Sequence, residues 1–272
     1  MKHKISIIIP TLNEADNISH LLRHLTANSS EENIAEIIVI DGGSADGTQE
    51  IVSTLLSSQK CQTERSRSPI EIKSDLCREA NKKVLDTKFS IENSTRTNIL
   101  LINSKKGRAK QMNIGSKQAT GNILYFLHAD SFPPKNFDQH IINEVSKNNL
   151  AGCFRMKFDH NHWWLRLASW LTQFHWRACR GGDQSQFITK LLFDELGGFD
   201  ETFIIYEDND LINKLYAKDE FVVINKKITT SARLYKRVGI WKLQYHFWAI
   251  YIKKWFGAAP EELYAYYKKK IT

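Results

Sequence analysis

Polar and acidic residues stand directly after three apolar runs of the sequence, at positions that a ligand could reach. The run 123–127 (ILYFL) stops at 128–130 (HAD), and two earlier runs stop at 10–14 (PTLNE) and 41–48 (DGGSADGT). Short β-rich runs bounded by glycine or proline are typical of buried strands whose ends reach solvent. Ligands of an open parallel sheet bind beyond the carboxyl ends of its strands. The three segments are therefore predicted to share one ligand-binding edge.

The segment 41–48 combines a carboxylate with several glycines. Asp41 offers a fixed hydrogen-bond acceptor, and glycines such as Gly43 permit positive φ and close approach of a ligand. The alternative is an ordinary strand-to-helix turn in which Asp46 or Thr48 caps the next helix. Two further polar strand ends nearby favour the ligand-binding interpretation.

Another acidic cluster lies in the segment YEDNDL, where Glu207, Asp208 and Asp210 open an apparent helix. Carboxylates in a first helical turn are stabilised by the helix dipole, so capping is one interpretation of the cluster. Asp210 follows Asp208 by two residues, about 200° around the helix, and is predicted to be structural.

The elements that must position these residues alternate along the first half of the chain. Strands are predicted at 5–9, 36–40, 98–102 and 122–127, and helices at 15–27, 48–56 and 108–119. This alternation favours right-handed βαβ units and an α/β fold, with a mostly parallel central sheet covered by helices on both faces. The polar stretch 57–97 interrupts the series and is predicted to be an insertion, helical around 74–88.

The composition is that of a globular protein. The chain has 272 residues, of which 42% are hydrophobic and 25% charged, so a wholly disordered chain is excluded. The net charge of +8 favours an anionic partner, but no nucleic-acid-binding motif is recognisable. Four scattered cysteines lack zinc or disulfide spacing, which indicates a reducing compartment. Because no apolar run has the length of a signal peptide or a membrane span, a cytoplasmic location is expected.

Four motifs, in this order, carry a resemblance to a known family. They are ISIIIPTLNE (5–14), IIVIDGGSADGT (37–48), KGRAKQMNIGSKQATGNILYFLHAD (106–130) and GGFDETFIIYEDNDL (197–211). The sequence resembles the family 2 glycosyltransferases, enzymes of the GT-A fold that use nucleotide-sugar donors. Within that family it is similar to a bacterial branch with HAD at the metal motif, a GGDQ segment and a basic, aromatic C-terminal tail.

The resemblance implies a set of residues around the nucleotide sugar. These residues are Thr11, Asn13, Glu14, Asp41, Gly43, Arg108, Asn113, Asp183, Gln184, Glu207 and Arg233. Arg108 has independent chemical support, because a guanidinium can bind phosphate oxygens through two parallel bonds. For Arg108 and for Arg233, which would close over the diphosphate, the alternative is a solvated basic surface.

The resemblance also implies a metal ion and a catalytic base. Asp130 would coordinate Mg²⁺ or Mn²⁺, whose charge stabilises the departing nucleoside diphosphate. His128 stands where the family usually has an acid, and it would either ligate the metal or hydrogen-bond the nucleotide. Asp208 would remove the proton of the acceptor hydroxyl, so that the acceptor attacks from the opposite face and inverts the anomeric centre.

Two aromatic and basic stretches, 160–180 and 239–257, are predicted to be helical. In the second stretch Trp241, Trp248 and Trp255 recur every seven residues and so share one helix face. Their composition suits a membrane interface, which would place the protein at the inner face of the membrane with a lipid-linked acceptor. The alternative is packing against the sheet domain or another subunit, and the sequence leaves the oligomeric state open.

The resemblance ends near residue 237, which predicts a catalytic domain at 1–237 and a helical tail at 238–272. The expected function is transfer of a sugar from a nucleotide sugar to a hydroxyl acceptor. One alternative is a nucleotidyltransferase, against which the Glu-Asp pair at 207–208 argues. The other is a non-catalytic protein that binds nucleotide sugars or a membrane surface, which the replacement at His128 suggests.

Overall fold

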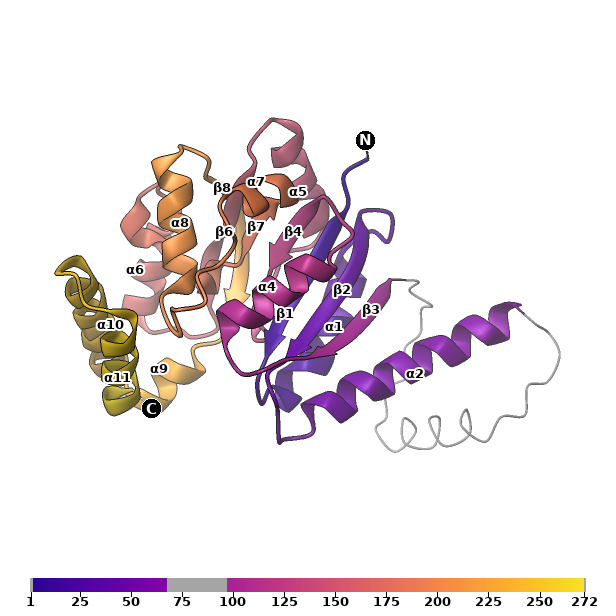
Figure 1. Cartoon of the computed structure of the whole chain (residues 1–272), viewed down its shortest axis with the longest axis horizontal. Coiled ribbons are helices and arrows are strands. Elements are labelled where there is room, and N and C mark those ends of the chain that lie inside the picture. The colour runs from indigo at the N-terminus through magenta and orange to yellow at the C-terminus, as the bar shows by residue number, and fades with distance from the viewer. Residues whose placement is uncertain (1, 68–96, 272) are drawn as a thin grey trace.

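The computed structural model describes residues 2–67 and 97–271 (Figure 1). The predicted insertion at 57–97, with its helix around 74–88, lies for the most part outside the described residues. The helix α2, Thr48–Arg67, is longer than the predicted 48–56 and reaches into that stretch.

Eight strands of the described chain form one curled sheet in the order β3-β2-β1-β4-β7-β6-β8-β5. Their bounds are β1 Ile5–Thr11, β2 Ile34–Asp41, β3 Asn98–Asn103, β4 Ile123–Phe126, β5 Ser131–Phe132, β6 Ala151–Phe158, β7 Gln186–Thr189 and β8 Val222–Thr230. Strands β3, β2, β1 and β4 run parallel, as do β6 and β8. Strand β7 is antiparallel to both β4 and β6, and β5 is antiparallel to β8. The predicted α/β fold with a mostly parallel sheet is confirmed.

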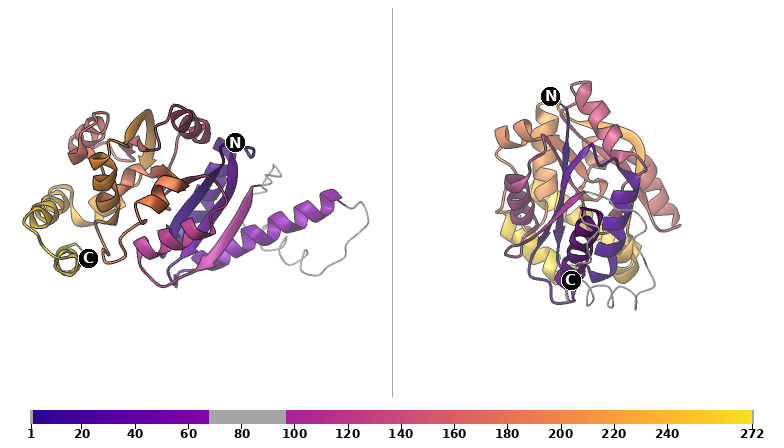
Figure 2. Two further views of the ribbon diagram at one scale, coloured as in Figure 1. Left: turned by 45° about the horizontal axis from the view of Figure 1, so that its top comes forward. Right: turned by 90° about the vertical axis from the view of Figure 1, so that its right-hand side faces the viewer.

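Helices cover both faces of this sheet, as the end-on view in Figure 2 shows. Besides α2 they are α1 Ala15–Asn28, α4 Arg108–Gln118, α5 Phe137–Ser146, α6 Trp163–Leu171, α7 Lys190–Glu195, α8 Glu207–Ala217, α9 Arg233–Val238, α10 Ile240–Trp255 and α11 Pro260–Lys270. Alternate residues of β1 enter two different cores. Ile7 and Ile9 pack with α1, α2 and α5, whereas Ile8 packs with α4, α7 and α8. Because both faces are buried, residues 7–9 at the centre of β1 are all apolar, and the polar Ser6 beside them is itself buried.

The helix predicted over 160–180 is wrong as a single element, since α6 ends at Leu171. Beyond α6 the buried guanidinium of Arg180 collects backbone carbonyls. Its Nη2 donates to Thr172 O at 2.7 Å and to Phe174 O at 2.6 Å. These two carbonyls would accept backbone N–H groups if the helix continued. Because Arg180 binds them instead, the chain leaves the helical path after α6.

The C-terminal helices form a small cluster at the end of the molecule opposite α2 (Figure 1). The stretch predicted at 239–257 is confirmed as α10, and α11 lies within the helical tail predicted at 238–272. Leu243, Ile250 and Leu263 form the centre of this cluster. Tyr206, directly before α8, packs against it, and its ring lies 5.7 Å from that of Tyr251. The tail therefore lies against the segment that leads into the acidic cluster of α8.

Candidate functional site

The first strand ends lie at one edge of the sheet, as the sequence predicted. Thr11 at the end of β1 is the register partner of Asp41 at the end of β2, which is in turn the partner of Asn103 at the end of β3. Leu127, just past β4, continues that strand's pairing by donating its backbone N–H to Ile8 O. The HAD segment therefore begins at the same edge.

Asp41 organises the loop that follows β2. Its buried carboxylate accepts hydrogen bonds from the backbone N–H groups of Gly43 and Ser44, at 2.9 and 2.8 Å, and from Gln49 Nε2 at 2.6 Å. Burial acts to raise the pKa of Asp41, but the hydrogen bond from the Ser44 hydroxyl, together with those already named, outweighs it and lowers the pKa. Gly43 has a φ of 91°, which L side chains rarely adopt. The strand-to-helix turn that the sequence offered as the alternative for residues 41–48 is therefore present. A contact of Asp41 with the nucleotide stays a prediction.

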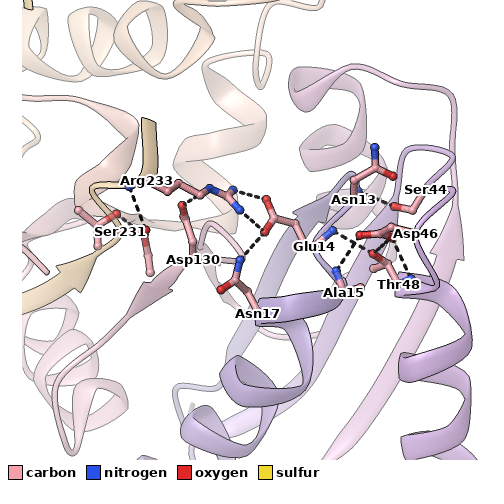
Figure 3. A network of polar contacts seen from close by, with 12 residues as sticks. Asn13, Glu14, Ala15, Asn17, Ser44, Asp46, Thr48, Asp130, Ser231 and Arg233 are labelled. Carbon is pink, nitrogen blue, oxygen red and sulfur yellow. Dashed lines mark hydrogen bonds and ion pairs between the residues drawn. The ribbon is translucent and has the colours of Figure 1, made fainter. Parts of the chain in front are cut away.

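Asn13 joins the β1 and β2 loops to each other (Figure 3). Its backbone N–H donates to Ser44 Oγ at 2.8 Å, and its side-chain oxygen accepts from the N–H of Ala45 at 2.9 Å. The Thr11 hydroxyl donates to Ile40 O at 3.2 Å. These contacts hold the predicted pocket residues Thr11 and Asn13 beside the loop of Asp41.

Arg233, the first residue of α9, connects the β1 loop to the HAD segment (Figure 3). Its Nη1 donates to Glu14 Oε2 at 2.9 Å, and its Nε lies 3.3 Å from Asp130 Oδ2. The hydrogen bond to Glu14, followed by the charges of Asp130 and Glu14, raises the pKa of Arg233 against the effect of burial. Arg233 thus joins two other residues predicted for the site, Glu14 and Asp130, in a first ionic group.

A second ionic group forms where the first residues of α4 and α8 meet. Arg108 Nε binds Glu207 Oε1, and Arg108 Nη2 lies 3.1 Å from Asp208 Oδ2. Although burial alone would lower it, the charges of Glu207 and Asp208 raise the pKa of Arg108. Burial raises the pKa of Glu207, which is fully buried, and the charge of Arg108 opposes that effect.

His128, two residues before Asp130 in the chain, lies beside the second ionic group, with its Nε2 4.0 Å from Asp208 Oδ2. Burial and the charge of Arg108 lower the pKa of His128 to about 4, so the imidazole is neutral at pH 7. Asp183 lies on the short helix η2, Gly182–Gln184. Asp183 is exposed to solvent on one side, while desolvation by the surrounding protein and the charges of Asp130 and Asp208 raise its pKa to about 6. Acidic charge is therefore concentrated around Asp130.

This concentration of carboxylates fits a divalent cation that is shared with a bound diphosphate. Within residues 2–67 and 97–271, no three His, Cys, Asp or Glu side chains are arranged as a ready metal cage. Mg²⁺ characteristically binds through one or two carboxylates plus substrate phosphates, so a complete cage is not required. Asp130 would supply the hard oxygen ligand, and the raised pKa of Asp183 marks acidic charge that a cation would offset. Direct ligation by His128 stays a prediction.

Two predicted residues are committed to other contacts. Asn113 binds the backbone of Phe199 through both ends of its amide, at 2.9 and 3.0 Å, and donates to Glu201. Gln184 is buried and accepts a weak hydrogen bond from Cys153 Sγ at 3.7 Å. Neither residue is joined to the two ionic groups.

Asp210 likewise lies outside the two ionic groups. It pairs with Lys214 at 2.9 Å, which agrees with its predicted structural role.

Gly182 is a site residue that the sequence did not single out individually. A Cβ atom built on it would lie 2.1 Å from Asp208 Oδ2 and 3.2 Å from His128 Nε2, so only glycine fits there without displacing the carboxylate. A Cβ atom built on its neighbour Gly181 would meet no other atom within 4 Å. The Gly-Gly pair in the sequence could have indicated a crowded backbone at this point, but the sequence does not show which of the two glycines is crowded.

The helices α6 and α10 together form an aromatic surface. Its exposed members are Trp163, Leu167, Trp170, Trp241, Tyr245, Trp248, Tyr251, Ile252 and Trp255. The two helices are joined by Trp164, whose Nε1 donates to Gln244 Oε1 at 3.0 Å and whose ring packs against Trp248. Part of the aromatic content therefore packs the tail, as one alternative predicted, while Trp255 remains 84% exposed. No helix among the described residues is both long and apolar enough to span a membrane.

Comparisons with known proteins agree with this geometry. The family model described as Glycosyl transferase family 2 matches residues 6–67 and 74–201. The glycosyltransferase AglE of Haloferax volcanii is 26% identical over 142 residues, which are 52% of this chain and 35% of AglE. The chain thus spans about a third of that relative.

Solved structures share the fold. Residues 1–349 of TarS from S. aureus, in complex with UDP, superpose with a TM-score of 0.56 at 17% identity, over 84% of this chain and 60% of that one. The mannosyltransferase PcManGT from Pyrobaculum calidifontis, in complex with GDP-Man and Mn²⁺, gives a TM-score of 0.59 at 17% identity, over 92% and 61%. At this identity the likeness establishes the GT-A fold alone.

Proposed function

The chain belongs to glycosyltransferase family 2, and from this membership we propose that it is an inverting, metal-dependent glycosyltransferase. The donor would be a nucleoside-diphosphate sugar, and the acceptor would carry a hydroxyl group. TarS and PcManGT bind UDP and GDP-Man respectively, which supports a nucleotide-sugar donor without selecting the base.

The observation that carries the proposal is the meeting of Asp208 with the HAD segment. Asp208 is the second residue of the helix α8, directly after buried Glu207; it is itself buried, and its Oδ2 lies 4.0 Å from His128 Nε2. A potential base and a potential metal ligand thus approach one site from α8 and from the end of β4. Capping alone does not explain why the carboxylate is turned toward a histidine and an arginine of other elements.

The proposed reaction is a single displacement. Asp208 takes the proton of the acceptor hydroxyl as the oxygen bonds to the anomeric carbon, and the bond from that carbon to the diphosphate oxygen breaks on the opposite face. Asp130, with Asp183 nearby, would hold a divalent cation, which supplies charge stabilisation to the leaving diphosphate. Arg233 can exchange its carboxylate partners for phosphate oxygens, to which a guanidinium binds well.

A panel of UDP- and GDP-sugars, each with Mn²⁺ or Mg²⁺, tests this function. We expect release of the nucleoside diphosphate from one class of donor, measured by a coupled assay and by chromatography of the products. Release of pyrophosphate from nucleoside triphosphates would instead indicate nucleotidyl transfer. Donor binding without any release, in the presence of varied hydroxyl acceptors, would favour a non-catalytic binding protein.

We also propose that the acceptor is lipid-linked and that the aromatic surface contacts an anionic membrane. Exposed tryptophans suit the headgroup region, and the exposed Arg166, Lys242 and Lys253 lie on the same two helices. Lys268–Lys270 at the end of α11 add exposed positive charge. The composition of this surface matches an interfacial anchor better than a solvated face, because large apolar side chains alternate with cations.

Binding to anionic liposomes should therefore depend on this surface. We expect the intact chain to co-sediment with phosphatidylserine vesicles, with the lysine contribution screened by salt and the tryptophan contribution persisting. The double variant Trp248→Ser, Trp255→Ser should lose most of the binding. Leu191→Ser is the matched control, because Leu191 is 86% exposed on α7, outside the aromatic surface. Absence of binding at low salt would make a soluble acceptor the preferred interpretation.

A further inference from the structure

Arg108 occupies an unfavourable place for a cation. It is the first residue of α4, where the helix dipole is positive and a positive side chain is repelled. The helix has no side-chain cap, and Gly107 before it has a φ of 146°. The stability of α4 therefore does not explain an arginine at this position, and its contacts outside the helix must.

Those contacts join Arg108 to α8, 99 residues further along the chain. Nε binds Glu207, and Nη2 reaches Asp208 at 3.1 Å. Two nitrogens of one rigid guanidinium thus hold two consecutive acids, at a helix start that favours negative charge. Glu207 is fully buried, so it fixes the guanidinium rather than responding to solvent.

The Asp208 carboxylate is consequently held from two sides. Its Oδ2 lies against Arg108 Nη2 on one side and against the backbone of Gly182 on another, where a Cβ would come within 2.1 Å. The approach of His128 Nε2 is also to Oδ2. Since these contacts are all made by one oxygen, Oδ1 is the oxygen left to receive a proton.

We propose that Arg108 is a positioning residue for Asp208, and that the chain Glu207, Arg108, Asp208 fixes the direction in which the base presents its free oxygen. This assigns Arg108 to the acceptor side of the reaction instead of the donor phosphates that its chemistry first suggested. The inference rests on the proposed function, because it takes Asp208 to be the base. It extends that function by naming the residues that orient the proton transfer.

The variants Arg108→Met and Arg108→Lys test whether Arg108 positions Asp208 or binds the phosphates of the donor. With UDP and GDP plus Mn²⁺ as probes, calorimetry gives nucleotide affinity. Hydrolytic release of nucleoside diphosphate gives turnover, with water standing in for the acceptor hydroxyl. We expect Arg108→Met to lower kcat by ~10²-fold, the scale of a misplaced catalytic group, while nucleotide Kd stays within about twofold. Arg108→Lys should recover part of kcat, because one charged donor remains. Lys110→Met, an exposed cation in the same helical turn, is the control.

Two further measurements keep the inference testable if Arg108→Met folds poorly. Glu207→Gln keeps an oxygen that can accept from Nε, and it should lower kcat modestly with unchanged nucleotide Kd. Gly182→Ala should displace Asp208 and lower kcat, whereas Gly181→Ala, with open space at its Cβ, should be close to the wild-type protein.

A double-mutant cycle distinguishes failure of this inference from failure of the proposed function. In an Asp208→Asn background, Arg108→Met should cost little more, because the base it orients is gone. A large rise in nucleotide Kd with unchanged kcat in Arg108→Met would overturn the positioning role and return Arg108 to the phosphates. Normal turnover of Asp208→Asn alone would instead overturn the proposed base, whatever Arg108 does.

Discussion

Replacing Asp208 with asparagine should collapse turnover while nucleotide binding is retained. The amide has the shape of the carboxylate, and its oxygen can still accept the hydrogen bond from Arg108 Nη2, now 3.1 Å from Asp208 Oδ2. It cannot take a proton from the acceptor hydroxyl, and general-base assistance is worth ~10² to 10⁴ in rate. Steady-state release of nucleoside diphosphate measures kcat, and calorimetry with UDP or GDP plus Mn²⁺ measures binding.

Asp210→Asn provides the matched control for this substitution. Asp210 belongs to the same helical turn and has the same formal charge, but it pairs with Lys214 at 2.9 Å instead of facing Arg108. It should retain near-normal turnover and lose at most a small part of its thermal stability, because exposed i,i+4 pairs contribute about 0.3–0.5 kcal/mol. If Asp208→Asn behaved like this control, Asp208 would be better interpreted as a helix-capping residue.

The first half of the fold could be predicted because its signals are local. Residues 7–9 and 37–40 are apolar without interruption, and they are buried on both faces of the sheet within β1 and β2. The turn chemistry at 41–48 marks the end of β2 equally clearly. Where both faces of a strand are covered, hydrophobicity alone is a sufficient signal.

Strands β6 and β8 were missed because their pairing is not local. β8 contains the exposed Lys226 and Lys227 in its centre, which breaks an apolar run. Its partner β6 lies far along the chain, and the register shifts between Phe154 and Arg155. A strand of this kind is stabilised by its neighbours in the sheet and not by its own composition.

The site shows the same division. The gathering of strand-end residues followed from parallel pairing, since Thr11 and Asp41 must be neighbours if β1 and β2 are in register. The contact of Arg108 with Glu207 and Asp208 could not be predicted, because opposite charges 99 residues apart have many available partners. The bridge from Arg233 to Glu14 likewise depends on where the chain places α9, which no local pattern specifies.

Replacing Asp130 with alanine should abolish the part of nucleotide-induced stabilisation that depends on metal. A ligand that binds only the folded protein at 100 times its Kd contributes about 2.7 kcal/mol, which shifts Tm by on the order of 5 °C for a chain of this size. We expect such a shift for the wild-type protein with Mn²⁺ plus UDP or GDP, measured by scanning fluorimetry. Without the Asp130 carboxylate, adding Mn²⁺ should give no more than the nucleotide does alone.

The ligand-induced shift, and not the absolute Tm, carries this test, because Asp130 also pairs with Arg233 at 3.3 Å. Losing that pair changes the stability of the ligand-free protein by itself. Asp16→Ala is the control, since Asp16 is exposed in the first turn of α1 and acts on Arg233 only through its charge. It should keep the full metal-dependent shift. A shift in Asp130→Ala equal to that of Asp16→Ala would remove Asp130 from the metal site, because a cation held elsewhere would not require this carboxylate.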